Sequence, residues 1–562
     1  MAQLIECVPN FSEGNDMALI AQITAEIEAV DGVKLLDVDP GKATNRTVVT
    51  FVGTPEEVIE AAVRAVRKAS ELIDMSKHSG EHPRFGATDV CPLVPVAGIT
   101  MEETVVYAHE LARRLGEEVG TTVYCYESAA RTPERGNLAT VRAGEYEGLE
   151  KRLQDPKWAP DFGPAKFNAK SGATAVGARD FLIAYNVNLN TTSTRRANAI
   201  AFDVREKGRV KRGGDGLTGE IVRDDAGKPV WEPGSLKCVK GIGWFIEEYG
   251  VAQISMNLTN IAVTPMHVAF DECCERARER GIRVTGSEVV GLVPLHAILD
   301  AGRYFLRKQK RSTGVSDAEL IKIAVKSMGL DELTPFEPGE KIIEYVLEDK
   351  SAAPLVDLSL RGFVELTASE SPAPGGGSVA AALGALGAAL GAMVANLSSH
   401  RRGWDARWEG FSTWAEKGKA YHDELLRLVD SDTEAFNDVM AAFRLPSGTA
   451  EEKATQAAAV LEATKRAIEV PLEVMQQSCD SMDVIAEMAS IGQETSLSDA
   501  GVGMLCARSA VLGAGLNVRI NCADLTDDGL KAEYLARAAA LEERAVAREA
   551  EVLAAVNATL GG

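Results

Sequence analysis

Residues 73–95, IDMSKHSGEHPRFGATDVCPLVP, contain two histidines among prolines, glycines and charges of both signs. Pro83 disfavours helical geometry at His82, because a proline restricts the residue before it to extended conformations. The glycines let the chain turn tightly, and an apolar run at residues 90–96 closes the stretch as a strand would. A histidine held on such a loop can move protons near neutral pH. A surface loop whose histidines have no function is the open alternative.

A second polar turn, DPGKATNR at residues 39–46, separates two strand-like runs. Loops at strand ends are where open α/β sheets bind ligands. Asp39, Asn45 and Arg46 are therefore candidates for a pocket. The segment could equally be a connection whose charges are solvated, and the pattern favours neither interpretation.

A third unusual segment, DPKWAPDFGPAKFNAKSGATAVG at residues 155–177, is a poor helix and a poor strand, because prolines and glycines interrupt it. Linkers rarely contain a tryptophan and two phenylalanines. The composition therefore favours a loop folded against a ligand or a domain face over a simple linker. Lys166 and Lys170 could meet carboxylates there.

A glycine-rich segment in the C-terminal part, SPAPGGGS at residues 371–378, could also serve chemistry. Gly375, Gly376 and Gly377 before Ser378 predict a flexible turn with a helix cap, and exposed N–H groups that could hold an anion. Close helix packing explains the glycines equally well.

Three acids in LVDSDTEAF, residues 428–436, form the last candidate group. The pattern places Asp430, Asp432 and Glu434 near a helix start, where acids complement the helix dipole. Residues two apart lie on nearly opposite sides of a helix, so Asp430 and Asp432 cannot face one pocket.

The whole-chain composition limits the classes of partner. A chain of 562 residues is too long for one core, and 46% hydrophobic with 25% charged residues is ordinary for a soluble protein. A net charge of −22 argues against nucleic-acid binding, which needs a basic face. The nine cysteines include no C-x-x-C, so no disulfide framework or zinc site is expected. The N-terminus lacks signal-peptide features, and a reducing cytoplasm fits.

Strand and helix signals alternate to about residue 335, and from about residue 358 alanine and leucine dominate and strand signals vanish. The predicted fold class is therefore two α/β (α+β sandwich-like) subdomains followed by an all-α helical bundle. An uncharged stretch after residue 377 is long enough to span a bilayer. Its small residues favour close packing, as a bundle centre or a subunit seam, over a membrane span. The expected domains are residues 1–181, 182–335 and 357–562, with a linker at 336–356.

Motifs along nearly the whole chain carry a family resemblance. The first set resembles the formiminotransferase domain of the bifunctional formimidoyltransferase-cyclodeaminases, and the second set resembles their cyclodeaminase half. The first set is ECVPNFSEG (6–14), LLDVDPGKATNRTVVTFVG (35–53), LIDMSKHSGEHPRFGATDVCPLVPV (72–96), RAGEYEGL (142–149), WAPDFGP (158–164) and VKGIGWF (239–245). The second set is SPAPGGGSVAA (371–381), LVDSDTEAF (428–436), RLPSGTAEEK (444–453) and NVRINCADLTD (517–527).

The resemblance implies a two-step folate enzyme. A formimino group moves from N-formiminoglutamate to N5 of tetrahydrofolate, and 5-formiminotetrahydrofolate then cyclises to 5,10-methenyltetrahydrofolate with release of ammonia. The co-substrate is tetrahydrofolate, with or without a polyglutamate tail, and no metal is expected. The resemblance further implies a cytoplasmic homo-oligomer, such as a ring of dimers, that serves histidine degradation and one-carbon metabolism, with no membrane partner.

The resemblance also assigns roles to particular residues. The catalytic histidine of the transferase falls on His82, and the catalytic aspartate of the cyclodeaminase falls on Asp432, with the glycine turn lining the same pocket. An imidazole suits proton transfer between the attacking and leaving nitrogens, and a carboxylate can take the N10 proton. The folate-binding segment falls on Gly163, Pro164, Ala165, Lys166, Phe167, Asn168, Ala169, Lys170, Ser171 and Gly172.

Three alternatives stay open. The donor could be formylglutamate, or the helical domain could act as a methenyltetrahydrofolate cyclohydrolase, because the acid–base requirements of these reactions are alike. A non-catalytic scaffold that retains the fold is the third. The presence of His82, Asp432 and the glycine turn counts against it.

Overall fold

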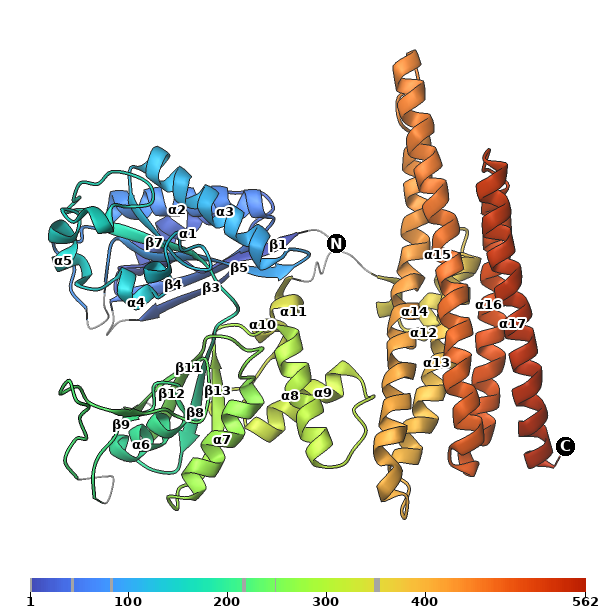
Figure 1. Ribbon diagram of the computed structural model, residues 1–562. Helices are drawn as coiled ribbons and strands as arrows, with labels where there is room; N and C mark the ends of the chain where they lie inside the picture. The colour runs from blue at the N-terminus through green and yellow to red at the C-terminus, as the bar shows by residue number, and fades with distance from the viewer. Residues whose placement is uncertain are drawn as a thin grey trace. The chain divides into compact units, whose positions relative to one another are not determined.

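The computed structural model describes residues 3–41, 45–80, 84–214, 219–247, 249–347 and 354–561. The chain forms two compact units: residues 1–297 with 328–348, and residues 298–327 with 349–562. The first unit contains two β-sheets with their helices, and the second is helical (Figure 1). The predicted fold class is thereby confirmed.

The first sheet is a mixed sheet with helices packed on both faces. Its strands are β1 (Leu4–Cys7), β2 (Asn10–Phe11), β3 (Lys34–Gly41), β4 (Arg46–Gly53), β5 (Thr88–Ala97), β6 (Thr122–Glu127) and β7 (Ala173–Ala178), and its helices are α1 (Met17–Glu28), α2 (Pro55–Leu72), α3 (Met101–Arg114), α4 (Leu138–Val141) and α5 (Glu145–Arg152). Strand β4 pairs antiparallel with β1, β2 and β3, whereas β7 lies parallel between β5 and β6. Side chains alternate along each strand, so Ile5, Cys7, Phe11 and Phe51 enter one core with α1–α3.

The opposite face of this sheet is more polar. Glu6 and Asn10 lie next to core residues on their strands, so they project from the other face, and the register places Arg46 of β4 there too. Helices α4 and α5 cover the part of this face formed by β5–β7, where Val141 and Leu149 are buried. The remaining part can present charged groups to a ligand.

The strand β7 was missed by the sequence analysis, which treated residues 155–177 as one loop. Its residues are small, and small side chains give a weak strand signal. The close packing of neighbouring strands requires small residues here, since a Cβ at Gly177 would lie 2.6 Å from the Tyr126 ring. The loop prediction is therefore wrong for the last part of the segment.

The second sheet is antiparallel in the order β11-β12-β8-β13. Its strands are β8 (Ile183–Leu189), β11 (Val239–Ile246), β12 (Val251–Leu258) and β13 (Val284–Val290), and the small hairpin β9 (Arg209–Val210) and β10 (Trp231–Glu232) lies outside it. Helices α6 (Thr194–Val204) and α7 (Met266–Arg278) pack on one face. Strands β11 and β12 pair antiparallel along their full length.

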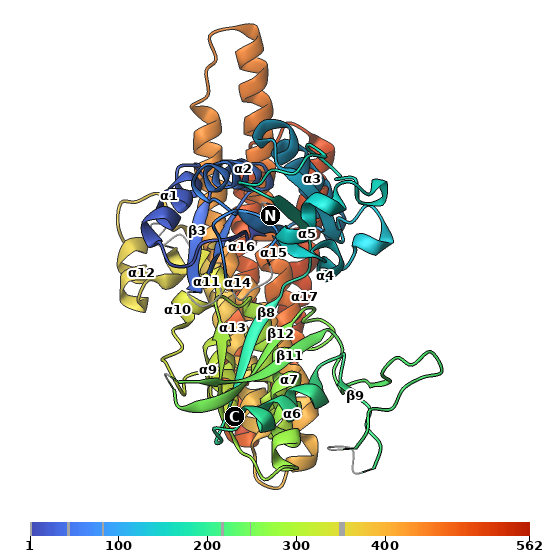
Figure 2. The same cartoon turned by 90° about the vertical axis from the view of Figure 1, so that its left-hand side faces the viewer.

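The second unit is a bundle of long helices with α13 in contact with three of the others. Its principal helices are α12 (Leu360–Thr367), α13 (Gly376–Ser399), α14 (Trp408–Phe443), α15 (Ala450–Ile491), α16 (Leu497–Cys522) and α17 (Asp528–Leu560). Glycines let α13 approach its neighbours closely: a Cβ at Gly387 would lie 2.8 Å from the Gly503 carbonyl oxygen. The tip formed by α14 and α15 projects beyond α16 and α17 in both views (Figures 1 and 2).

Two long helices pass a length and composition test for membrane spans. They are α13 and the segment at residues 494–522. In α13, 61% of the most apolar window is buried within the bundle, and in the other segment 50% is buried. Core helices of soluble bundles pass the same test, so the packing of these helices accounts for their composition.

Two helices that lie between the sheets and the bundle in the sequence pack with the bundle. It consists of α8 (Leu295–Lys308) and α9 (Asp317–Met328), whereas α10 (Pro338–Lys341) and α11 (Ile343–Leu347) belong to the first unit. In the loop between α8 and α9, the Thr313 N–H donates to Ser412 Oγ at 3.0 Å, and Asn396 Nδ2 donates to the Gly314 carbonyl at 2.8 Å. The compact second unit therefore starts earlier in the chain than the expected boundary at residue 357.

Candidate active sites

The first candidate site is organised around Asn45 and His78. His78 Nε2 donates to the Asn45 carbonyl, at 2.9 Å. Asn45 has a positive φ of 50°, and its side-chain amide donates to the Ser79 carbonyl at 2.8 Å. The Gly14 N–H donates to Asn45 Oδ1 at 3.0 Å. This network joins the two polar turns that the sequence analysis singled out.

The predicted catalytic residue His82 lies outside the described residues, together with residues 42–44 of the polar turn. Of the two histidines in the stretch, His78 has a structural bond to a backbone carbonyl. Because that carbonyl can only accept, Nε2 carries the proton and Nδ1 holds the lone pair in the neutral ring. His78 thus positions the turn.

Arg46 lies on the polar face of the first sheet beside a buried carboxylate, whereas Asp39, at the end of β3, is exposed. Arg46 donates to Asn10 Oδ1, and Arg46 Nη1 is 3.7 Å from Asp89 Oδ2. Burial lowers the pKa of the Arg46 guanidinium, and the nearby Asp89 opposes this shift. Asn45 and Arg46 are adjacent in the chain, but their side chains have different partners, and Asp39 has an exposed side chain.

The expected folate-binding segment, residues 163–172, is an exposed loop held at both ends. At its start, Thr122 Oγ1 donates to the Pro164 carbonyl at 2.8 Å, and Gly163 has a φ of +78°. Near its end, the Tyr146 hydroxyl donates to the Ala169 carbonyl at 2.6 Å and the Lys170 ammonium donates to the Glu71 carbonyl at 2.6 Å. The loop has a fixed shape against α2 and α5 and an exposed outer surface.

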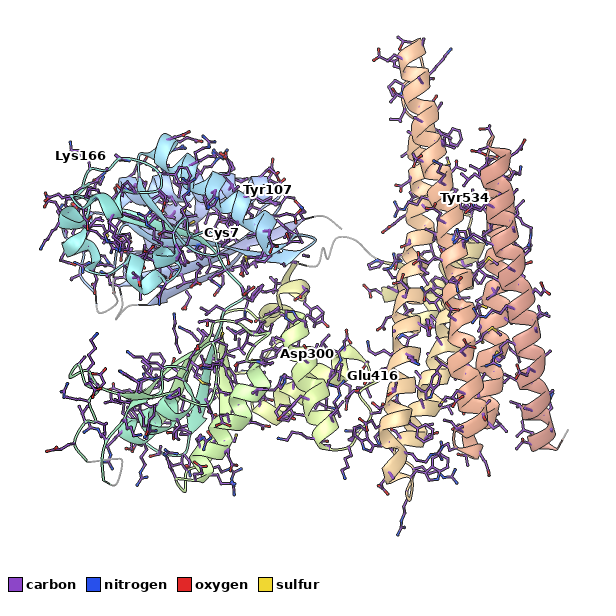
Figure 3. All side chains as sticks on the ribbon, in the orientation of Figure 1. Cys7, Tyr107, Lys166, Asp300, Glu416 and Tyr534 are labelled. Atoms are coloured by element: carbon purple, nitrogen blue, oxygen red, sulfur yellow. The ribbon has the colours of Figure 1, made fainter. Side chains whose placement is uncertain are left out.

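Within this loop, the two lysines differ in availability. Lys170 is held by the backbone of α2, whereas Lys166 is exposed at the outer edge of its unit (Figure 3). Phe167 packs against Tyr146 with ring centroids 5.5 Å apart. The aromatic residue that argued against a simple linker therefore fastens the loop to α5.

A polar row on the second sheet was missed by the sequence analysis. Trp244 Nε1 donates to Gln253 Oε1 at 3.1 Å, and Gln253 Nε2 donates to Asn188 Oδ1 at 2.8 Å. Asn188 Nδ2 donates to Glu332 Oε2 at 2.5 Å. The signal was present in NVNLN, residues 186–190, where asparagines alternate with apolar residues at the period of a strand. This row lies on the face that α6 does not cover, where Asn188 and Gln253 are buried.

The second candidate site joins the start of α13 to Asp432 of α14. The Ser378 N–H donates to Asp432 Oδ2 at 2.8 Å, and the Ser378 hydroxyl donates to the same oxygen at 3.0 Å. A Cβ at Gly377 would overlap the carboxylate. The structure therefore confirms that the glycine turn and Asp432 lie together, and only a glycine permits this approach.

The position of Asp432 differs from the sequence expectation in two ways. Asp430, Asp432 and Glu434 lie well inside α14, which begins at Trp408, and not near a helix start. Ser378 is not the cap either: Gly375 occupies the N-cap position and has no capping side chain. Asp432 supplies the missing acceptor from another helix, so the carboxylate complements the start of α13.

Burial raises the pKa of the Asp432 carboxyl, and the two bonds from Ser378 oppose that shift. A carboxylate in this setting is a stronger base than one in water, because its ionised form is partly desolvated. The expected anion at the glycine turn is therefore the protein's own carboxylate. Its second oxygen, Oδ1, lies beside Gly377.

Asp430 faces away from this site, as the helix geometry predicts. Its Oδ1 accepts a hydrogen bond from the Leu355 N–H at 2.5 Å. Burial raises the pKa of Asp430 as well, and the backbone N–H groups of residues 355 and 356 oppose the shift. The two aspartates thus have separate partners.

Asn517 of α16 is a site residue that the sequence analysis did not single out, although its motif NVRINCADLTD was noted. A Cβ at Gly376 would lie 3.4 Å from Asn517 Nδ2, which donates to the Gly513 carbonyl at 3.1 Å. On α14, Phe436 and Met440 follow Asp432 at helical spacing and are 36% and 39% exposed. The site thus has an acid, an amide and an apolar surface.

Across the parts of the chain that the structure describes, no group of three His, Cys, Asp or Glu side chains could hold a metal ion. Six of the nine cysteines are buried.

Family profiles match the chain in three consecutive segments. Residues 4–179 match "Formiminotransferase domain, N-terminal subdomain", residues 184–348 match "Formiminotransferase domain", and residues 359–540 match "Formiminotransferase-cyclodeaminase". The three segments follow one another in the order of the two sheets and the bundle.

Known proteins resemble the whole chain or one of its parts. The formimidoyltransferase-cyclodeaminase of Mus musculus is 44% identical over 559 residues, which is 99% of both chains. A glutamate formimidoyltransferase of Streptococcus pyogenes is 41% identical over 307 residues, 55% of this chain and 94% of the relative. A methenyltetrahydrofolate cyclohydrolase of Methylorubrum extorquens is 37% identical over 193 residues, 33% of this chain and 93% of the relative.

Proposed function

The chain belongs to the formimidoyltransferase-cyclodeaminase family, and we propose that its two reactions are divided between the two compact units. The enzyme is bifunctional and folate-dependent. It transfers the formimino group from N-formiminoglutamate to N5 of tetrahydrofolate, and it cyclises 5-formiminotetrahydrofolate to 5,10-methenyltetrahydrofolate with release of ammonia. The proposal adds the residues that carry out each reaction and the unit in which they act.

In the transfer reaction, N5 attacks the amidine carbon of the donor and the bond to the glutamate nitrogen then breaks. A proton must leave N5 and reach the departing nitrogen, and we assign this transfer to His82. His78 already has a structural role, because it is bonded to the Asn45 carbonyl. This supports the assignment to His82, the other histidine of the stretch. The loop at residues 163–172 and the polar face of the first sheet are the proposed folate surface.

In the ring closure, N10 attacks the formimino carbon and ammonia leaves. We assign the removal of the N10 proton to Asp432, because burial makes it a stronger base and Ser378 fixes its orientation. Oδ2 accepts both bonds from Ser378, so Oδ1 is the oxygen that meets the substrate. Asn517 can orient the substrate, and Phe436 and Met440 provide an apolar surface for the flat pterin.

The observation that carries this assignment is the contact between Asp432 and the start of α13. The test follows methenyltetrahydrofolate by absorbance in two assays, one started with N-formiminoglutamate and tetrahydrofolate and the other with 5-formiminotetrahydrofolate. The wild-type chain should be active in both. A chain active only in the second assay would have no transferase, and formylglutamate as donor would then be tried.

A second activity for the bundle is favoured by the similarity to the cyclohydrolase of Methylorubrum extorquens. In that reaction water attacks the methenyl carbon, and the same carboxylate could take a proton from the water. Loss of methenyltetrahydrofolate absorbance in the presence of the enzyme, above the uncatalysed rate, would establish it. No loss would restrict the bundle to ring closure.

We further propose a cytoplasmic homo-oligomer that works in histidine degradation, with rings of dimers as the expected form. The small residues of α13, which were expected at a subunit seam, pack inside the bundle, where a Cβ at Gly384 would overlap Ser478 Oγ. Large apolar side chains on the outer faces of α13 and α16 support a contact with a second copy instead. They are Leu386, Met393, Leu397, Val502, Leu505, Leu516 and Ile520.

Sedimentation tests this assembly. The double variant Leu386→Glu with Leu516→Glu should shift the wild-type oligomer to smaller species, because charges on these faces oppose burial. A wild-type chain that sediments as a monomer would refute the proposal.

A further inference from the structure

Backbone hydrogen bonds join the stretch of the assigned base to the folate loop, residues 163–172. The N–H of Met75, which precedes that base in the chain, donates to the Lys170 carbonyl at 2.9 Å. The N–H of Ala87, which follows the base, donates to the Ser171 carbonyl at 2.8 Å. The end of the folate loop is therefore held by residues on both sides of the base in the sequence.

Tyr146 of α5 contacts both of these segments. Its backbone N–H donates at 2.9 Å to the carbonyl of Arg84, two residues after His82. Its hydroxyl donates to the Ala169 carbonyl of the folate loop at 2.6 Å, and its ring packs against the Phe167 ring with centroids 5.5 Å apart. One residue thus holds the stretch of the assigned base through its backbone and the middle of the folate loop through its side chain.

An ion pair strengthens the attachment of α5 to Arg84. Arg84 Nη2 is 2.5 Å from Glu147 Oε1, and the side chain of Arg84 is 17% exposed. The guanidinium carbon of Arg84 also lies 5.8 Å from the centroid of the Tyr146 ring, within the range of a cation–π contact. Leu149, on the same helix, is fully buried in the core. Helix α5 is therefore a fixed support from which the Tyr146 side chain reaches the folate loop.

The folate loop needs such a support, because most of it is exposed. Residues 163–166 and 168–170 are exposed, whereas Ser171 and Gly172 at the end of the loop are buried. Ordering an exposed loop costs conformational entropy. A loop that is ordered before its ligand arrives does not add this cost to binding, so a contact that fixes the loop raises affinity without touching the ligand.

We propose that Tyr146 is a positioning residue of the transfer reaction, which fixes the folate loop for tetrahydrofolate beside the stretch of the assigned base. This proposal rests on the transferase function proposed above. Tyr146 acts on tetrahydrofolate through the loop and does not contact the reacting atoms. Its hydroxyl therefore contributes to the affinity for tetrahydrofolate and not to the affinity for N-formiminoglutamate.

The experiment measures steady-state transfer by the full chain while each substrate is varied at a saturating concentration of the other. Tyr146→Phe keeps the ring and removes the hydroxyl, so the KM for tetrahydrofolate should rise about 3- to 10-fold, the effect of one neutral hydrogen bond. The KM for N-formiminoglutamate and kcat should both stay within about twofold of the wild-type values. Tyr146→Ala also removes the contact with Phe167, so the KM for tetrahydrofolate should rise about 10- to 100-fold.

Tyr124→Phe is the matched control. The Tyr124 hydroxyl donates to the Trp158 carbonyl at 2.7 Å, so this substitution removes a bond of the same kind from the same unit, but not a bond to residues 163–172. The KM for tetrahydrofolate should stay within about twofold of the wild-type value in this variant. Ring closure of supplied 5-formiminotetrahydrofolate should stay at the wild-type rate in every variant, which verifies folding of the other unit.

Three results would overturn the inference. A lower kcat with both KM values unchanged in Tyr146→Phe would mean a loss of folded enzyme and assign Tyr146 a structural role. Equal rises in both KM values, or unchanged kinetics, would remove the selective link between Tyr146 and tetrahydrofolate. The same rise in Tyr124→Phe would attribute the effect to the loss of any such hydroxyl bond in this unit. Absence of transfer by the wild-type chain would instead refute the proposed function itself, so the two failures can be told apart.

Discussion

The two candidate sites place their chemistry on different kinds of structure. In the first unit, charged side chains from separate segments converge on Asp89, seven residues after the assigned base His82 in the sequence. In the bundle, the assigned base lies well inside a long helix, and its environment comes from the start of a neighbouring helix. A loop site can be altered by exchanging side chains, whereas the bundle site depends on how closely two helix backbones approach.

The comparison predicts that each site can be disabled alone. His82→Ala should reduce formimino transfer about 100- to 10,000-fold, the usual effect of losing a general acid–base group. Ring closure of supplied 5-formiminotetrahydrofolate should continue. Asp432→Asn, which keeps the side-chain shape, should do the reverse, so that 5-formiminotetrahydrofolate accumulates and ammonia release stops.

Chromatographic separation of the folates together with an ammonia assay measures both effects. Asp89→Asn serves as the comparison in the first unit, with a weaker effect on transfer and none on ring closure. Parallel loss of both activities in a folded His82→Ala variant would contradict two independent sites.

Glu6, a buried acid of the first unit, should affect stability, whereas Asp432 of the bundle should affect catalysis. Glu6 is 5% exposed, and burial raises its pKa to about 7 despite the nearby Arg179. Because the folded-state pKa exceeds that of the unfolded chain, Glu6 favours the folded state only while protonated, and stability is lost as the pH rises through about 7. Glu6→Gln should therefore stabilise the first unit at pH 8.5 by up to about 3 kcal/mol and change little near pH 4.5.

Scanning calorimetry of the full-length variant and wild type at the two pH values tests this. Ring closure takes place in the other unit, so that activity should persist at pH 7. An equal change in the transition temperature at both pH values would show that Glu6 is not protonated in the folded protein.

Ser378→Ala should sharpen the contrast between the pH profiles of the two reactions. The hydroxyl of Ser378 stabilises the ionised form of Asp432, whose pKa burial has raised. Removing it raises that pKa further, so the acid limb of ring closure should move to higher pH, with about a tenfold loss of kcat/KM on that limb. The pH profile of formimino transfer should not move. An unchanged acid limb would exclude Asp432 as the titrating base.

The smallest effect is expected at Asp430. Asp430→Asn keeps an acceptor for the Leu355 N–H, so it should cost about 1 kcal/mol or less in the free energy of unfolding and leave ammonia release near the wild-type rate. Ammonia release by this variant and by Asp432→Asn compares the two aspartates directly. Loss in Asp430→Asn with retention in Asp432→Asn would reverse their roles.

Sequence patterns predicted the layers of the fold and the neighbourhood of each site better than the contacts within them. Periodicity identified most strands, and the glycine turn was placed with Asp432 through the family resemblance. The start of a helix was misplaced at Asp430 because polar residues within α14 resemble a cap, and only packing against α13 shows that the helix continues. The cluster of Arg46, Asp89 and Arg142 joins residues 43 to 96 positions apart, and no local sequence pattern indicates that such distant residues come into contact.

The contact between Asp432 and α13 links the chemical step to the mechanics of the bundle. The carboxylate to which we assign removal of the N10 proton is also the acceptor for the first turn of α13. When Asp432 is protonated, the negative charge that faces this helix end disappears and its hold on the first turn weakens. When the proton leaves with ammonia, the product has formed, the charge returns and the turn tightens. On this assignment, the end of a core helix loosens while the intermediate is bound and resets as the product forms.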